Sequence, residues 1–457
     1  MNACASLRAS LPLFLVLAAC GGEEAPASDQ AADAACCATV EWVQRVGSYF
    51  TDHGASVVTD AEGNAILAGL TSEAVTAGDG TVTTGSYVPL FVKLDTSGHP
   101  LWSRSFPEAR AKLERLRIDD EGRLTLAGAA REILDFGDGP HPPIGESDVF
   151  VARFDANGLI LWSRRLGGDA RINLFDVAVD HMGHTILVGS FEGTIDLGRG
   201  SLTSVGSLVG AHDGLVVKLD PEGNTLWSVS FGGPGNDGAT AVAVDDASNL
   251  LVAGSIDDAT TADRSAPVDS NTRDALLMKL DPDGAMQWRR TFGGPGLDTL
   301  QELAIDAQGD LSALGLFTQE DPLGTPLFVG DHGMLSMVVR FDPSGIPRWA
   351  HDFGGIPQDL AVDAEGNSIA VGYRFTRAGR EMVVARHDGD GALEWQLSNG
   401  QVWEAIATGV AFDHAGNAFL TGSFTGNLEL GDHTLTSAGF SDTVASSSDI
   451  YVARLLP

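Results

Sequence analysis

Two pairs of closely spaced aspartates are the side chains whose types and spacing best suit chemistry. Asp281 and Asp283 lie in Asp-Pro-Asp-Gly, and Asp388 and Asp390 lie in Asp-Gly-Asp-Gly. Two carboxylates in one short turn supply the oxygen ligands that Ca²⁺ prefers. Neither pair is followed by the bidentate acid that completes a full calcium loop. We therefore keep these four aspartates as candidate metal ligands and favour a turn role for them.

Histidines are the other side chains that could act as ligands or general bases, and four of the eleven lie in or near long polar segments. These four are His141, His212, His332 and His433. The sequence contains no HExxH or GxSxG motif and no metal-ligand spacing. Glycine-rich segments at 232–237 and 293–298 lack the strand-to-helix context of a phosphate-binding loop. The sequence therefore predicts no catalytic residue and no cofactor.

Most of the remaining chemistry is that of turns, because aspartates recur where short apolar runs end. The first set is Asp60, Asp119, Asp180, Asp245, Asp306, Asp363 and Asp413, and the second is Asp95, Asp155, Asp220, Asp281, Asp342 and Asp388. A carboxylate at the first position of a turn accepts the backbone N–H two residues on. An alternative is that the first set forms a carboxylate ring around a cation. Recurrence in every unit favours the turn role.

These turns belong to a repeated unit, seen most clearly at 175–233. Four apolar runs (177–179, 185–191, 215–219 and 225–231) are separated by two tight turns and one long loop. This pattern predicts a four-stranded antiparallel meander. Tryptophans mark the repeat about every 60 residues, a period typical of propellers and solenoids. They are Trp42, Trp102, Trp162, Trp227, Trp288, Trp349 and Trp395.

The two ends of the repeat region predict that it closes into a ring. The last unit stops after its third strand, whereas 38–48 reads as a fourth strand without the three that should precede it. Together they complete one unit. The predicted fold is an all-β, seven-bladed β-propeller at 38–457, closed by pairing of the N-terminal strand with the last three strands. We expect this ring to be monomeric.

Such a ring has two different faces. The tight turns share one face, here called the turn face. The loops between the second and third strands and the connections between blades share the other, here called the loop face. The second-to-third-strand loops are 71–88, 129–147, 192–213, 257–273, 318–335, 376–381 and 425–448, and they differ between units. Variable loops on a rigid scaffold are where binding usually occurs.

Two further recurrences predict structural contacts. A basic residue stands near the end of each third strand, where it should extend to the rim or meet a turn carboxylate. These residues are Lys93, Arg153, Lys218, Lys279, Arg340, Arg386 and Arg454. The tryptophans should wedge between blades and donate the indole N–H to a neighbouring carbonyl.

The N-terminal stretch predicts export and a lipid anchor. Residues 1–19 read as a signal peptide with an apolar core at 11–17, and Leu-Ala-Ala precedes Cys20. This segment resembles the lipobox of bacterial lipoproteins, which implies lipidation of Cys20 and attachment to the membrane, with Gly21 favouring the outer membrane. Residues 20–37 form an acidic tether. At its end, Cys36 and Cys37 leave open a vicinal disulfide, an inter-chain bridge or inert thiols; we favour the bridge or no role.

The charge of the chain limits its partners. There are 62 Asp and Glu against 28 Lys and Arg, a formal net charge of −34. This excess argues against binding to nucleic acid and against docking on anionic lipid through basic residues.

The repeated units, of the form VAVDxxGNxxLxGSFxG followed by FVxKLDxxGxxLW, resemble the SBBP-type β-propeller repeats of secreted and lipid-anchored bacterial proteins. The resemblance covers about 38–457 and implies the fold, but little about function. The LDxxGxxLW part also resembles a quinoprotein repeat, although the Thr-Gly-Lys usual in that turn is absent, so no quinone cofactor is expected.

Function is therefore predicted at the level of class. We expect a non-catalytic cell-envelope lipoprotein, periplasmic or surface-exposed, that binds a protein or a glycan through the loop face. The alternative is a propeller hydrolase or lyase acting on polysaccharide, which would need a carboxylate pair or a histidine cluster at the loop-face mouth. A structural spacer would need no pocket at all.

Overall fold

The computed structural model describes residues 38–72, 76–77, 81–82, 87–145, 148–168, 170–205, 211–257, 273–293, 296–318, 335–377, 379–399, 404–438 and 447–457. All the secondary-structure elements assigned in these residues are β-strands. None of these segments forms a helix long and apolar enough to span a membrane. The signal peptide, the tether and the predictions for Cys20, Cys36 and Cys37 lie outside the described residues.

Most strands pair in antiparallel groups of four that follow the chain order. Five separate sheets comprise β2 (His53–Thr59), β3 (Ala65–Thr71), β6 (Val88–Leu94) and β7 (Pro100–Ser105); β8 (Lys112–Ile118), β9 (Leu124–Ala130), β10 (Asp148–Phe154) and β11 (Ile160–Leu166); β12 (Arg171–Val179), β13 (Thr185–Glu192), β16 (Asp213–Leu219) and β17 (Thr225–Phe231); β18 (Gly238–Val244), β19 (Leu250–Ile256), β20 (Asp274–Leu280) and β21 (Met286–Phe292); and β22 (Thr299–Ile305), β23 (Leu311–Phe317), β24 (Leu335–Phe341) and β25 (Pro347–Asp352).

The last sheet joins two such groups through a single parallel pairing of Arg380 with Glu404. One group is β26 (Ile356–Val362), β27 (Ser368–Phe375), β28 (Arg380–His387) and β29 (Leu393–Ser398); the other is β30 (Glu404–Phe412), β31 (Ala418–Thr425), β34 (Asp449–Leu456) and β1 (Thr39–Val46). Three hairpins lie outside these groups: β4 (Thr76–Ala77) with β5 (Thr81–Val82), β14 (Thr194–Asp196) with β15 (Ser201–Thr203), and β32 (Asn427–Leu430) with β33 (His433–Thr436).

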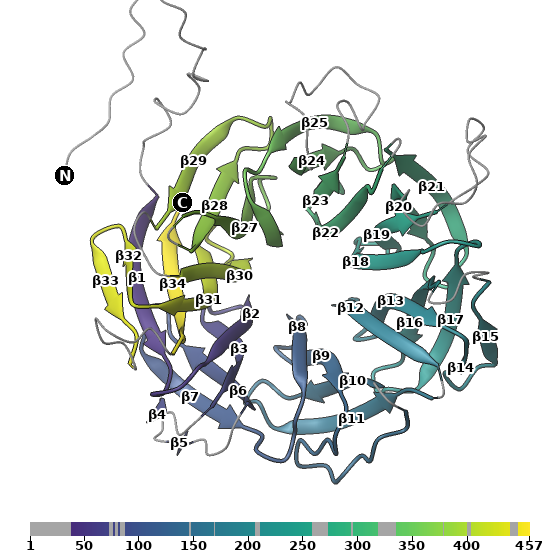
Figure 1. Ribbon diagram of the computed structural model, residues 1–457, viewed down its shortest axis with the longest axis horizontal. Helices are drawn as coiled ribbons and strands as arrows, with labels where there is room; N and C mark the ends of the chain where they lie inside the picture. The colour runs from purple at the N-terminus through teal and green to yellow at the C-terminus, as the bar shows by residue number, and fades with distance from the viewer. Residues whose placement is uncertain are drawn as a thin grey trace, which may run out of the picture.

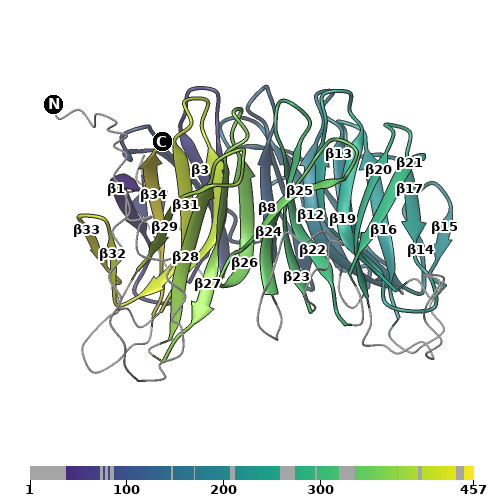
Figure 2. The ribbon, with the colours of Figure 1, turned by 90° about the horizontal axis from the view of Figure 1, so that it is seen from above.

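The groups are the blades of a β-propeller. Figure 1 shows them arranged around a central axis, with the first strand of each blade innermost. These inner strands touch in the order β2, β8, β12, β18, β22, β26 and β30, and β30 also touches β2. Neighbouring blades pack face to face through buried aliphatic side chains, as Ala127 and Val151 of one blade do with Leu187 and Val217 of the next. The tight hairpin turns lie along one side of the molecule (Figure 2).

The turn aspartates act as the sequence predicts. Asp180 Oδ1 accepts the backbone N–H groups of Met182 at 3.0 Å and His184 at 2.9 Å, which fixes the hairpin between β12 and β13. Its other oxygen, Oδ2, lies 3.0 Å from Lys218 Nζ. Burial alone would raise the pKa of Asp180, but hydrogen bonds from His184 and Lys218 hold it below its ordinary value.

The same ion pair recurs in every repeat, which confirms the prediction that the basic residues meet turn carboxylates. The pairs are Lys93 with Asp60, Arg153 with Asp119, Lys218 with Asp180, Lys279 with Asp245, Arg340 with Asp306, Arg386 with Asp363 and Arg454 with Asp413. Each carboxylate of the first set therefore has a cation within its own blade, which supports the turn role over a shared cation.

Tryptophans join successive blades. Trp162 donates its indole N–H to Pro221 O at 2.8 Å in the next blade. A Cβ atom at Gly223, where φ is +83°, would lie 2.9 Å from the same ring, so this turn needs glycine for both conformation and space. The predicted indole bond is confirmed for four tryptophans: Trp42 to Thr96, Trp162 to Pro221, Trp227 to Pro282 and Trp349 to Gly389.

Removing the cation of one buried pair should destabilise the whole propeller. Arg340→Met leaves the Asp306 carboxylate buried without its cation, and the free energy of unfolding in urea should fall by about 3–5 kcal/mol. Arg199→Met is the control, because Arg199 is exposed on the β14–β15 hairpin and its loss should change stability by less than about 0.5 kcal/mol. Equal effects of the two substitutions would contradict the role of the pair.

Candidate binding site on the loop face

The candidate metal ligands are engaged in turns. In each Asp pair the first carboxylate, Asp281 or Asp388, accepts the backbone N–H of the second aspartate at 3.0 Å. Among the described residues, no three His, Cys, Asp or Glu side chains are grouped as they would be around a metal ion. A metal role for Asp281, Asp283, Asp388 and Asp390 therefore stays a prediction without support from the geometry.

The candidate histidines lie on different blades and have different neighbours. His141 Nε2 lies 3.5 Å from Asp138 Oδ2, whereas His433 Nε2 lies 3.2 Å from the backbone oxygen of Val40. The backbone oxygen of His212 accepts the N–H of Asp237. His332 lies outside the described residues. The structure therefore does not bring His141, His212 and His433 together.

Charged side chains that the sequence did not single out meet across the central channel. Every inner strand has a register shift, and the residue after the shift is Arg115 in β8, Asp176 in β12, Glu302 in β22 and Asp359 in β26. Arg115 reaches across to form an ion pair with Glu302, and Arg117 Nη2 lies 2.7 Å from Asp176 Oδ1. We call these five residues the channel cluster.

The burial of the carboxylates in the channel cluster indicates a structural role. Asp176, Glu302 and Asp359 are exposed by 1%, 8% and 6%. Asp176 and Asp359 also accept backbone N–H groups from Val242 and Val410 on the blades that follow them. Burial raises the pKa of Glu302 and Asp359. Burial disfavours the charge of Arg115, but the surrounding carboxylates hold the pKa of its guanidinium above its ordinary value.

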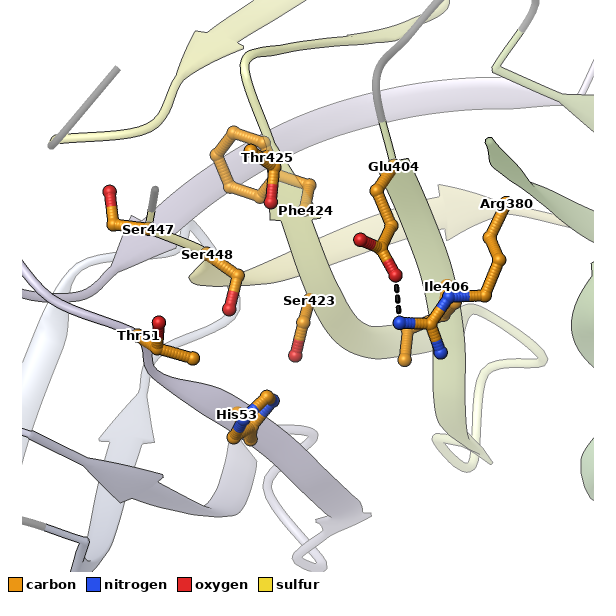
Figure 3. A pocket seen from close by; sticks show the side chains of 10 residues that line it. All are labelled: Thr51, His53, Arg380, Glu404, Ile406, Ser423, Phe424, Thr425, Ser447 and Ser448. Carbon is orange, nitrogen blue, oxygen red and sulfur yellow. Dashed lines mark ion pairs between the residues drawn. The ribbon is translucent and has the colours of Figure 1, made fainter. Parts of the chain in front are cut away.

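A cavity of about 360 Å³ opens where three blades meet at the loop face. His53 is the first residue of β2 and Thr51 lies just before it, while Arg380 begins β28 and Glu404 begins β30. Its other lining residues are Ile406, Ser423, Phe424, Thr425, Ser447 and Ser448. Figure 3 shows the ion pair between Arg380 and Glu404 on one side, with His53 and the serines around the rest. We call this cavity the loop-face pocket.

The loop-face pocket offers hydrogen-bonding groups of several kinds. The side chains of Arg380 and Glu404 are 40% and 37% exposed, so their hydrogen-bonding atoms remain accessible to a ligand. Burial, together with the nearby charge of Arg380, lowers the pKa of His53, which favours the neutral imidazole with one donor and one acceptor. The Ser447 hydroxyl is buried and has no hydrogen-bond partner within the described part of the chain.

Nothing in the loop-face pocket forms a catalytic pair among the described residues. No hydrogen bond joins the His53 ring to a serine within the described part of the chain. Ser423 Oγ accepts the N–H of Gly54, and Ser448 Oγ donates to the backbone oxygen of Asp52. The carboxylate of Glu404 is paired with Arg380. This arrangement offers hydrogen-bonding groups to a polar ligand.

Exposed aromatic rings lie beside the pocket. Tyr49 and Phe50, immediately before Thr51, are 65% and 50% exposed. Phe375 is 71% exposed and pairs across the strands with Arg380, whose guanidinium lies 5.5 Å from the ring centroid of Tyr373. Exposed aromatic groups that flank a polar pocket are typical of recognition surfaces.

The glycine-rich segment 232–237 lies beside two buried carboxylates, its own Asp237 and Asp213 at the start of β16. A Cβ atom at Gly232 would lie 2.8 Å from both Asp213 Oδ1 and Asp237 Oδ2, so these carboxylates face each other across the glycine. Burial raises the pKa of Asp237 to about 6, and the charges of Asp213 and Asp257 add to the rise. In the preceding blade, Asp148 begins the third strand as Asp213 does here. Arg165 Nε lies 2.6 Å from Asp148 Oδ2, so this carboxylate has a cationic partner.

This difference gives a prediction for pH. A carboxyl whose pKa is raised by folding stabilises the protein below its unfolded pKa, and this stability is lost as pH rises through about 6. Asp213→Asn replaces one carboxylate by an amide that can donate to Asp237, so thermal unfolding at pH 7.5 should show a gain of about 1 kcal/mol and a flatter dependence between pH 4 and 7.

The matched control is Asp148→Asn, which leaves the buried Arg165 without its carboxylate and should destabilise at both ends of that pH range. A loss of stability from Asp213→Asn as large as that from Asp148→Asn would contradict the account of two opposed carboxylates.

No family model matches the chain. It is 22% identical over 203 residues to the uncharacterized WD repeat-containing protein L264 of Acanthamoeba polyphaga mimivirus, covering 38% of this chain and 14% of that protein. It is 29% identical over 113 residues to the regulatory protein FlaEY of Caulobacter vibrioides, covering 25% and 12%. The chain therefore spans only about an eighth of the length of these curated relatives.

Solved structures similar to this chain include the Pan2 WD40 domain of Neurospora crassa, with 10% identity, 88% of each chain covered and a TM-score of 0.44. A gluconolactonase of Xanthomonas campestris has 14% identity, with 81% of this chain and 90% of that chain covered and a TM-score of 0.38. The strand pairing and the arrangement of the blades define the protein as a β-propeller repeat protein.

The sequence pattern did not identify the residues of the loop-face pocket. His53, Arg380 and Glu404 are far apart along the chain and belong to no motif. The general place was predicted, because these residues lie at the ends of strands that face the variable loops. The signal that could have identified them is the departure of each residue from its counterparts in the other repeats.

Proposed function

We propose that this protein is a non-catalytic cell-envelope lipoprotein whose propeller binds a glycan or a protein through the loop face. The observation that carries the proposal is the loop-face pocket, where an accessible Arg380–Glu404 pair, a neutral His53 and several hydroxyl groups surround a cavity of about 360 Å³. Cavities of this size hold small polar ligands such as sugar units. The aromatic rings of Tyr49, Phe50 and Phe375 extend the surface beside it.

We further propose a ring of seven blades closed by β1, of the SBBP type. In support, β1 pairs antiparallel with β34 along its length, from Thr39 opposite Leu456 to Val46 opposite Ile450. The indole of Trp42 then reaches Thr96 in the next blade, as the other bonded tryptophans do. Pairing of β1 with β34 removes an exposed edge that could otherwise recruit another chain.

The proposed anchor fits this arrangement. Thr39 pairs with Leu456, and the C-terminus lies on the side that carries the tight turns (Figure 2). The tether at 20–37 would therefore reach the propeller from the turn face. A lipid on Cys20 would hold the turn face toward the membrane and leave the loop face directed away from it.

Substitutions in the pocket test the proposal. The test is a screen of envelope polysaccharides and proteins with the purified full-length protein. Arg380→Ala should weaken binding of the captured ligand about tenfold or more, because charge-assisted hydrogen bonds contribute about 1.5–3 kcal/mol. His53→Ala should weaken it about threefold to tenfold, because a hydrogen bond from a neutral group contributes about 0.5–1.5 kcal/mol. The matched control is Arg348→Ala, which removes an exposed cation from the β24–β25 hairpin on the turn face. Capture that the pocket variants leave unchanged would contradict the proposed site.

A further inference from the structure

A second cleft opens on the loop face between the inner strands β8 and β12, which lie next to each other in Figure 1. It encloses about 540 Å³ and is separate from the loop-face pocket. Three basic side chains line it, Arg110, Lys112 and Arg131, and two acidic ones, Glu114 and Glu132. Asn173 and Phe175 of β12 lie on the other wall. We call it the basic cleft.

The basic cleft belongs to a blade whose charge differs from that of the rest of the chain. Residues 107–168 hold 9 of the 28 basic residues and 11 of the 62 acidic residues, whereas 19 basic and 51 acidic residues lie elsewhere. This blade is nearly neutral within a strongly acidic protein. Fixed charges interact mainly within a Debye length of about 8 Å at physiological ionic strength, so the side chains that line the cleft, three cations and two carboxylates, decide what it attracts.

The cations of the basic cleft are available for a ligand. Arg131 has no ion-pair partner within the described part of the chain. Arg110 lies 3.7 Å from Glu132, and Lys112 lies 2.7 Å from Glu114. Arg110, Lys112 and Glu132 are more than half exposed, and Glu114 is 24% exposed. The more exposed pair, Arg110 with Glu132, contributes little free energy. An anion that accepts hydrogen bonds from several of these cations can therefore take the place of the existing ion pairs at a small cost in free energy.

The opposite wall of the cleft is apolar and aromatic. Side chains of β12 alternate between exposed and buried from Arg171 to Phe175, so that Phe175 is 41% exposed while Ile172 and Leu174 are buried. An exposed ring facing a cationic wall suits a ligand with an apolar face and a charged substituent. A sugar ring that bears a carboxylate has both features.

We propose that the basic cleft binds an anionic sugar polymer, with carboxylates held by Arg110, Lys112 and Arg131 and a sugar ring stacked on Phe175. The inference rests on the proposed binding role of the loop face and adds the charge of the ligand. It also gives the loop face two binding places, one on each side of the channel mouth, as a polymer with many repeating units requires for avidity.

Polygalacturonate and its methyl ester are suitable probes, because they share a sugar backbone and differ in charge. In affinity electrophoresis, the migration of the full-length protein should be retarded by polygalacturonate in the gel and not by the ester. Arg110→Gln with Arg131→Gln should weaken this binding about tenfold or more. Raising the salt concentration should weaken it as well, because the contacts are ionic. Arg199→Gln, which removes one exposed cation from the β14–β15 hairpin, should leave it unchanged.

Equal binding of the ester, or unchanged binding by the double variant, would overturn the proposal. Failure of polygalacturonate to bind the wild-type protein would also overturn it, whereas capture of another ligand through Arg380 and His53 would leave the proposed function standing. Phe175→Ala should reduce binding without changing its salt dependence, since the ring contributes no charge.

Discussion

The ion pair between a turn aspartate and a third-strand cation is the contact on which the propeller depends. Each blade buries charged side chains close to its tight turn, and burial without a partner would cost several kcal/mol. Asp180 serves three functions at once, since its carboxylate fixes two backbone N–H groups and meets Lys218. The turn, the first strand and the third strand are thereby positioned by one side chain. Repetition of this contact in every blade gives the propeller a regular turn face.

The regular contacts could be predicted from the sequence because they depend on local spacing. An aspartate at the first position of a turn, a glycine at the fourth and a tryptophan seven residues after the aspartate each have one physical role, and that role recurs. The strand order, the turn bonds, the basic partners and the indole contacts follow from these positions. The antiparallel pairing of β1 with β34 is consistent with the same reasoning.

The site could not be predicted in the same way, because it is built where the repeats differ. After the register shift in each inner strand, the residue is Arg115, Asp176, Glu302 or Asp359 in four blades, but Ser56, Ala241 or Gly409 in the others. The four charged residues meet only because the blades are arranged around one axis, which brings distant strands together. His53, Arg380 and Glu404 show the same principle at the loop face, since three blades contribute to one cavity.

The two faces therefore have different roles. The turn face is uniform and stabilising, whereas the loop face carries the pocket, the exposed aromatic rings and the basic cleft. The buried channel cluster fixes the inner strands between them. A ligand that spans the loop face would contact residues from several blades without requiring any of them to move.

Hydrogen–deuterium exchange of the full-length protein, with and without total envelope polysaccharide, tests this division most directly. The account predicts slower exchange at the strand ends around His53, Arg380 and Glu404 and along the loop-face ends of β8 and β12, with the Asp-x-x-Gly hairpins unchanged. Protection centred on the hairpins of the turn face, with none at the loop face, would contradict it.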